Sequence, residues 1–87
     1  MIKAWSDDAW DAFVFWQSYD KRIMKRVLQL LKDIERNAYD GIGKPERLTG
    51  DLSAYWSRRI DDKHRLVYRI DGDTIRIVQC GSHYQDK

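Results

Sequence analysis

Apolar residues near the start of the chain recur at helical spacing. Ala9, Phe13 and Trp16 fall at positions i, i+4 and i+7, which would place them on one face of a helix. The pattern predicts an amphipathic helix over residues 7–19, with Ser6 as its N-cap. Two aspartates in the first predicted turn suit the positive end of the helix dipole.

A second predicted helix begins after Asp20, whose side chain can cap it. Its apolar residues repeat at helical spacing and are Ile23, Val27, Leu30, Leu31 and Ile34. Its opposite face is basic and carries Lys21, Lys25, Lys32 and Arg36. A solvated helix surface is the simpler interpretation of this basic face, and an RNA-contacting face is the alternative.

Alternating and β-branched patterns elsewhere predict strands. Residues 1–5 form a short first strand, and the second half of the chain holds three more, at 54–60, 64–70 and 74–80. The sequences "DDK" and "DGD" make the two turns between them, the second being a strong hairpin signal. Between the second helix and these strands, residues 37–53 lose all periodicity and are predicted to be a long loop. Long loops in compact domains tend to be functional.

The predicted fold class is therefore α+β, in the order β-α-α-β-β-β, with both helices packed on one face of a largely antiparallel, twisted sheet. Strand alternation turns Trp56, Ile60, Leu66, Tyr68 and Ile70 toward the helices. It leaves Tyr55, Ser57, Arg59, Arg65, Val67 and Arg69 on the open face. The hairpin brings Arg59 close to Arg65, and such a pair of cations favours an anion between them.

Composition limits the class of protein further. A chain of 87 residues with 43% hydrophobic residues and four tryptophans suits one folded domain, residues 1–87. The single cysteine, Cys80, excludes an internal disulfide and is predicted to be a packing residue. The net charge of +2 does not by itself indicate a nucleic-acid binder. Without a long apolar stretch or a signal peptide, we expect no membrane association and a cytoplasmic location.

The residues that could carry chemistry do not form a metal or cofactor site. The chain has two histidines, His64 and His83, and neither has cysteine or carboxylate neighbours at metal-ligand spacing. The "GIG" sequence lacks the strand–helix context of a phosphate-binding loop, and no serine lies in a nucleophile-elbow pattern. We therefore expect neither a metal nor a cofactor.

Five other groups could converge on the open face of the sheet, and they are Glu46, Arg59, Arg65, His83 and Tyr84. Metal-free cleavage of RNA needs a base for the 2′-hydroxyl proton, an acid for the leaving 5′-oxygen, and cations for the developing phosphorane charge. Glutamate, histidine and arginine can fill these roles, and a tyrosine ring can stack on a base. Taken singly, each of these residues is also an ordinary surface group.

Longer sequences in the chain resemble one family. The stretch "KPERLTGDLSAYWSRRIDDKHRLVYRI" followed by "SHY", together with "AWSDDAWDAFVFWQSYDKRIMKRV", is similar to the YoeB toxins of bacterial type II toxin–antitoxin systems, within the RelE/ParE superfamily. The resemblance implies an endoribonuclease, an mRNA interferase that cuts messenger RNA in the ribosomal A site. It also implies three partners, which are a YefM-like antitoxin, the ribosome and mRNA.

The resemblance implies the roles of individual residues as well. The catalytic glutamate of the family matches Glu46, its arginine matches Arg65, and its histidine–tyrosine ending matches His83 and Tyr84. Arg59 matches a supporting arginine, and Lys44 and Arg58 are predicted to contact RNA phosphates. The division of base and acid between glutamate and histidine stays open. Strict alternation from Ile75 and Ile77 would point His83 at the helices. A bulge at Gly81 is therefore predicted to turn the C-terminal tail, residues 82–87, toward the open face.

Other functions stay open at this point. A ParE-like inhibitor that binds DNA gyrase would share the fold, and so would an inert partner kept to repress its promoter with the antitoxin. The chain departs from the family at Thr49, where lysine is common, at Ser82, and in residues 85–87 beyond the usual end. Whether the free toxin is a monomer or a homodimer is also open.

Overall fold

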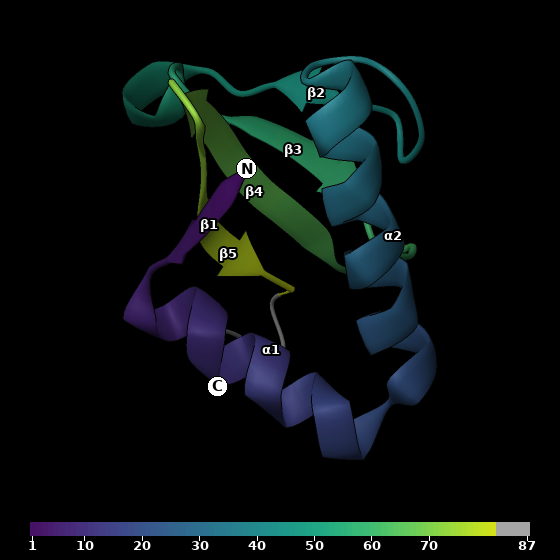
Figure 1. The fold of residues 1–87 in the computed structure, drawn as a ribbon. Coiled ribbons are helices and arrows are strands. Elements are labelled where there is room, and N and C mark those ends of the chain that lie inside the picture. The colour runs from purple at the N-terminus through teal and green to yellow at the C-terminus, as the bar shows by residue number, and fades with distance from the viewer. Residues whose placement is uncertain (82–87) are drawn as a thin grey trace.

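The structure is a computed structural model that describes residues 1–81 (Figure 1). Its elements in chain order are β1 (Ile2–Trp5), α1 (Asp7–Tyr19), α2 (Lys21–Asn37), β2 (Glu46–Arg47), the 3₁₀ turn η1 (Gly50–Leu52), β3 (Trp56–Arg59), β4 (Arg65–Asp71) and β5 (Thr74–Cys80). The predicted α+β class and the order of helices and strands are confirmed. One short strand, β2, is added to that order.

The strands form one sheet in the order β1-β5-β4-β3-β2. The pair β1–β5 is parallel, and the other three pairs are antiparallel. Both helices lie against the same face of this sheet (Figure 1). The opposite face is open, and it carries the side chains considered below.

The helix boundaries follow from their caps. The Ser6 hydroxyl accepts a hydrogen bond from the Ala9 amide at 3.2 Å, and α1 begins directly after it, as predicted. The Asp20 carboxylate accepts one from the Arg22 amide at 3.0 Å, and Asp20 is the single residue between the end of α1 and the start of α2. These bonds satisfy amides that the first turn of a helix leaves without a backbone partner.

The core lies between the helices and the sheet. All five apolar residues predicted for α2 are buried in it, together with Trp16 of α1. The sheet contributes Leu66, Tyr68, Ile75, Ile77 and Cys80, and Ile60 joins them directly after β3. Burial raises the pKa of the Cys80 thiol to about 12, so this thiol stays protonated at neutral pH and acts as a packing group, as predicted.

The prediction of a structureless loop at 37–53 was wrong for residues 46–47, which form β2, and for residues 50–52, which form η1. Glu46 and Arg47 form β2, which pairs with Ser57 and Trp56 of β3. Backbone hydrogen bonds hold the strand against β3. One more such bond follows the strand, in which the Leu48 amide donates to the Tyr55 carbonyl at 3.0 Å. A strand of two residues is too short to leave a periodic pattern in the sequence.

The bulge predicted at Gly81 lies instead within β5. Val67 of β4 pairs with Gln79, whereas Tyr68 pairs with Ile77, so Val78 is the extra residue. The bulge shifts the alternation by one position, and Cys80 therefore faces the core although Ile77 also does. Alternation counted from Ile77 consequently no longer holds at Cys80.

Candidate active site

The β3–β4 hairpin places two arginines side by side on the open face. Arg59 and Arg65 are direct partners in the register of the two strands, as predicted. The turn between them is fixed by the Asp61 carboxylate, which accepts hydrogen bonds from the Lys63 amide at 2.9 Å and the His64 amide at 2.7 Å. Because like charges at paired positions repel, this arrangement favours a carboxylate or phosphate close by.

Glu46 supplies such a carboxylate. It lies opposite Ser57 at the edge of the sheet, and its Oε1 atom is 3.7 Å from Nη1 of Arg65. The side chains of Glu46 and Arg65 are 67% and 39% exposed, so a ligand can reach both. The site therefore presents a carboxylate and two guanidinium groups to solvent, with strands β2, β3 and β4 each contributing one of them.

The loop before β2 is held against β3 by a glycine. The Gly43 carbonyl accepts a hydrogen bond from the Arg59 amide at 2.7 Å, and Gly43 has a φ of +80°. A Cβ atom there would lie 2.8 Å from Cδ2 of Leu30 and 3.2 Å from the Arg59 carbonyl oxygen, so a larger residue would displace the loop. Lys44, the predicted phosphate contact, follows directly and is exposed.

The predicted residues His83 and Tyr84 lie outside the described residues. The last described residues are, however, fixed next to Arg65. The Gly81 amide donates to the Arg65 carbonyl at 2.9 Å, and Trp16 Nε1 donates to the Cys80 carbonyl at 2.9 Å. Gly81 has a φ of +88°, and a Cβ atom on it would lie 3.0 Å from the Trp16 ring.

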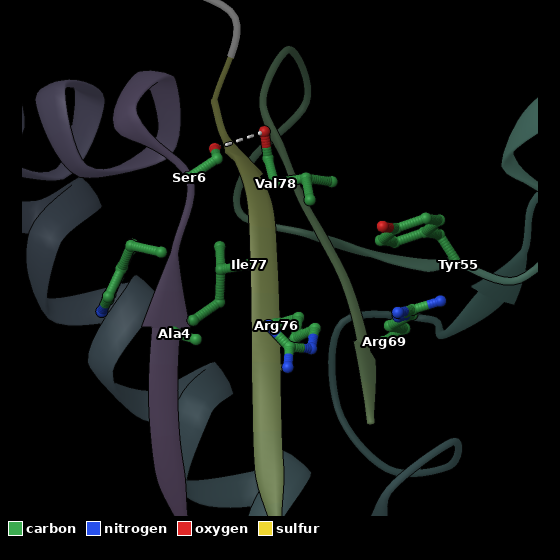
Figure 2. A pocket seen from close by; sticks show the side chains of 8 residues that line it. Ala4, Ser6, Tyr55, Arg69, Arg76, Ile77 and Val78 are labelled. Atoms are coloured by element: carbon green, nitrogen blue, oxygen red, sulfur yellow. Dashed lines mark hydrogen bonds between the residues drawn. The ribbon is translucent and has the colours of Figure 1, made fainter. Parts of the chain in front are cut away.

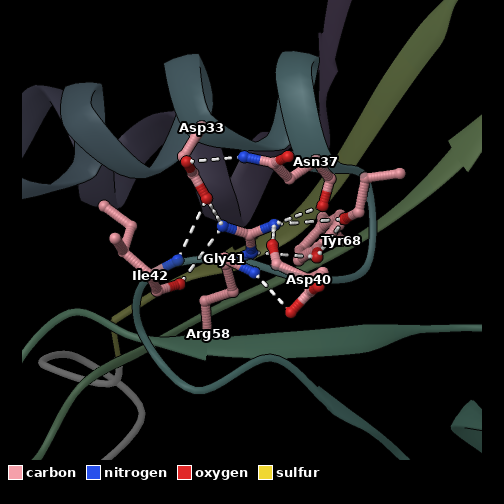
Figure 3. Close-up of polar contacts among 8 residues, drawn as sticks. Asp33, Asn37, Asp40, Gly41, Ile42, Arg58 and Tyr68 are labelled. Carbon is pink, nitrogen blue, oxygen red and sulfur yellow. Dashed lines mark hydrogen bonds and ion pairs between the residues drawn. The ribbon is translucent and has the colours of Figure 1, made fainter.

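The prediction that Arg58 contacts RNA was wrong. Its side chain is completely buried and points from β3 toward α2 (Figure 3). Nη1 lies 2.5 Å from the Asp33 carboxylate, and Nε donates to the Tyr68 hydroxyl at 3.1 Å. The remaining N–H groups bond to the carbonyls of Asn37, Ala38, Asp40 and Ile42. The inward positions predicted for Trp56 and Ile60 already implied this orientation.

In this network, formed by Arg58, Asp33 and Tyr68, the pKa values of Asp33 and Tyr68 are shifted from their ordinary values. Hydrogen bonding to the Arg58 guanidinium lowers the pKa of the Asp33 carboxyl, and a bond from the Ile42 amide adds to the effect. Burial raises the pKa of the Tyr68 phenol, whose hydroxyl donates to the Ala38 carbonyl at 2.7 Å. Asp33 is therefore ionised and Tyr68 neutral at physiological pH, which is the state that the hydrogen bonds require.

Asp33 should make the stability of the fold depend on acid pH. Because its pKa is lowered in the folded state, its contribution is present above the unfolded value of about 3.9 and is lost as the pH falls through the folded value. Asp33→Asn should thus destabilise the protein at pH 6–7, with a difference from the unmodified chain that shrinks below about pH 4. Urea unfolding at several pH values measures this difference in stability. Asp62→Asn, which changes an exposed carboxylate in a turn, is the control. A difference that is constant with pH would contradict the role of Asp33.

Metal binding finds no support in residues 1–81. Within that range, no group of three or more histidine, cysteine, aspartate or glutamate side chains is arranged to hold a metal ion. None of the helices in the described residues is long and apolar enough to cross a membrane.

Fold and site together define a class of protein: a small α+β domain that holds a carboxylate and two arginines on the open face of its sheet. A family model described as "YoeB-like toxin of bacterial type II toxin-antitoxin system" matches residues 5–84. Toxin YoeB of Escherichia coli (strain K12) is 48% identical over 80 residues, which is 92% of this chain and 95% of that protein. The chain therefore belongs to the YoeB-like toxin family of bacterial type II toxin–antitoxin systems.

Solved structures agree with this assignment. The chain superposes on the toxin of a heterotetrameric YoeB–YefM toxin–antitoxin complex from Staphylococcus aureus with a TM-score of 0.91 and 42% identity, covering 97% of this chain and 98% of that one. A YoeB dimer from the same organism gives a TM-score of 0.89 and 44% identity, with the same coverage.

Proposed function

We propose that this toxin is an endoribonuclease that cuts messenger RNA in the ribosomal A site and so stops translation. The observation that carries the proposal is the exposed Glu46–Arg65 pair with Arg59 opposite in register. A toxin that acted by binding alone would not need a carboxylate and two guanidinium groups converging on an open surface. The family membership supports the same conclusion.

In the proposed reaction the 2′-oxygen attacks the adjacent phosphorus after losing its proton to a base. The bond from phosphorus to the 5′-oxygen breaks, and an acid protonates that oxygen, leaving a 2′,3′-cyclic phosphate. Arg65 stabilises the negative charge on the phosphorane, and Arg59 supports it. Glu46 and His83 are the two proton-transfer groups, and no metal takes part.

The other predicted residues bind RNA in this proposal. Tyr84 stacks on a base and holds the strand bent for in-line attack, and Lys44 contacts a phosphate. The position of Gly81 supports a role for the tail, because its amide is bonded to the Arg65 carbonyl. The chain thus reaches His83 two residues after a point fixed at the candidate site.

The partners follow from the same proposal. A YefM-like antitoxin, of the kind that forms complexes with YoeB of Staphylococcus aureus, neutralises the toxin in this proposal by covering the open face. A segment with acidic side chains would suit Arg59 and Arg65. The ribosome and mRNA are the targets, so the toxin acts in the cytoplasm. A homodimer of the free toxin is proposed by analogy with the YoeB dimer of Staphylococcus aureus.

Primer extension on message from stalled ribosomes tests the proposal. In a purified translation reaction, the toxin should arrest protein synthesis and produce discrete message ends within the A-site codon. A Glu46→Gln variant, which keeps the shape of the side chain but cannot transfer a proton, should leave the message intact.

Two other outcomes would overturn this function. Normal translation combined with inhibited DNA gyrase would identify a gyrase-binding toxin. Normal translation and normal gyrase would identify an inert partner of the antitoxin.

A further inference from the structure

A second cluster of cationic side chains lies on the open face, away from Glu46. Arg69 of β4 and Arg76 of β5 line a hollow of about 330 Å³ together with Ala4, Ser6, Tyr55 and Val78 (Figure 2). This volume is at the lower end of the range of roughly 300–1,000 Å³ typical of small-ligand sites. The arginines and Tyr55 give the hollow both charge and an aromatic surface.

The charges of this hollow are incompletely balanced. Arg69 and Arg76 are direct partners in the register of β4 and β5, so two cations face each other on one surface. Asp71 is shared between them, since its Oδ2 atom lies 3.1 Å from Nε of Arg76 and 3.7 Å from Nη2 of Arg69. Two guanidinium groups and one carboxylate leave a net positive charge, which attracts a further anion.

Arg69 in particular has unused hydrogen-bonding capacity. Its distance of 3.7 Å from Asp71 is longer than a hydrogen bond. Its Nε atom is buried and has no hydrogen-bond partner among residues 1–81. A buried donor without a partner is unfavourable, and a bound anion would relieve this if the side chain turned toward it. The guanidinium carbon also lies 5.4 Å from the centre of the Tyr55 ring, forming a cation–π contact.

The hollow and the candidate active site are parts of one surface. Arg65 and Arg69 point to the same face of β4 and are four residues apart, which corresponds to about 13 Å along the strand. A single strand of RNA with stacked bases spans that distance in about four nucleotides, at about 3.4 Å each. One RNA strand can therefore contact both places.

We propose that this hollow binds a nucleotide of the RNA strand that flanks the cut, with its phosphate between Arg69 and Arg76 and its base against Tyr55. The inference rests on the proposed function, because it takes RNA as the substrate. A free phosphate or an acidic peptide would use the arginines alone, whereas a nucleotide also uses the aromatic ring. Stacking of this kind tolerates any base, so the subsite adds affinity without dictating sequence.

The test uses a single-stranded RNA of about six nucleotides, 2′-O-methylated throughout so that it cannot be cut. Fluorescence anisotropy gives its Kd, and ¹⁵N–¹H spectra follow the arginine Nε–H groups of the full chain. We expect the Arg69 signal to shift on binding, and Arg69→Gln and Arg76→Gln to weaken binding about tenfold each. Each variant should also lower the slope of log Kd against log salt by about 0.7. Tyr55→Leu should weaken binding about tenfold with no change in this slope.

Arg22→Gln is the matched control, because the Arg22 side chain is 94% exposed on α2, and it should bind like the unmodified chain. Binding unaffected by the variants at Arg69 and Arg76 would overturn the subsite, even for a toxin that cuts message. Binding of inorganic phosphate or a hexaglutamate peptide as tightly as the RNA, with the same dependence on both arginines, would also overturn it. RNA binding that depends on both arginines would support the subsite even for a chain that cuts no message.

Discussion

An Arg65→Ala variant is expected to cut message at least about a hundredfold more slowly than the unmodified toxin. The loss corresponds to about 3 kcal/mol of transition-state stabilisation, which is typical when one preorganised donor to a developing oxyanion is removed. The fold should be unaffected, since the side chain lies on the open face and its 3.7 Å contact with Glu46 is an exposed ion pair. Single-turnover cleavage on preformed toxin–ribosome complexes measures the chemical step alone.

Two further variants make the Arg65 result specific. Arg65→Lys should restore little activity, because an ammonium group cannot reproduce the two-pronged contact of a guanidinium with phosphate. Arg22→Ala removes an equal charge from the exposed surface of α2 and should cut normally. Near-normal cleavage by a folded Arg65→Ala protein would refute the assignment.

Arg58→Ala is expected to destabilise the fold by about 3–5 kcal/mol, the usual loss when one member of a buried charged network is removed. Arg58 is completely buried, and its N–H groups bond to Asp33, to the Tyr68 hydroxyl and to backbone carbonyls of residues 37–42. Without it these acceptors lose their donors and a cavity opens between α2 and the sheet. The total free energy of unfolding of a small domain is about 5–15 kcal/mol, so the loss is a large part of its stability.

Urea unfolding and amide hydrogen exchange can measure the effect of Arg58→Ala. Besides a lower midpoint, we expect faster exchange in residues 38–42, because Arg58 ties this loop to the end of α2. Arg59→Ala, one residue along β3 but exposed, should change the free energy of unfolding by less than about 1 kcal/mol. An Arg58→Ala variant of unchanged stability that failed to bind RNA would return this arginine to the RNA-binding surface.

Local patterns in the sequence were sufficient for most of the fold. Both helices begin after the residues that were predicted to cap them, because Ser6 and Asp20 each satisfy an amide of the first turn. Strand alternation was also sufficient to pair Arg59 with Arg65, since the hairpin connects neighbouring segments. These features depend on interactions over short distances in the chain, which periodicity records.

The features of the fold and the site that the sequence did not predict depend on contacts between distant segments. Glu46 lies on a strand that exists because β3 offers a free edge, and no local pattern reports an edge. Arg58 occupies an interior position that alternation indicated, but its charge suggested a surface residue. Only the opposing Asp33 and the carbonyls at the end of α2 make burial of a guanidinium tolerable. The cluster of Arg69, Arg76 and Tyr55 requires three strands to be aligned before it can be recognised.

The parallel pairing of β1 with β5 has a consequence for the order of folding during synthesis. Ile2 pairs with Thr74, so this contact closes residues 2–74 into one loop. Such a contact has a high entropic cost and cannot form before residue 74 has been synthesised. The hairpin of β3 and β4 can form earlier, because its strands are adjacent. A nascent chain that stops short of β5 would therefore leave β1 without its partner strand, and would also lack the Gly81 amide that anchors the chain at Arg65.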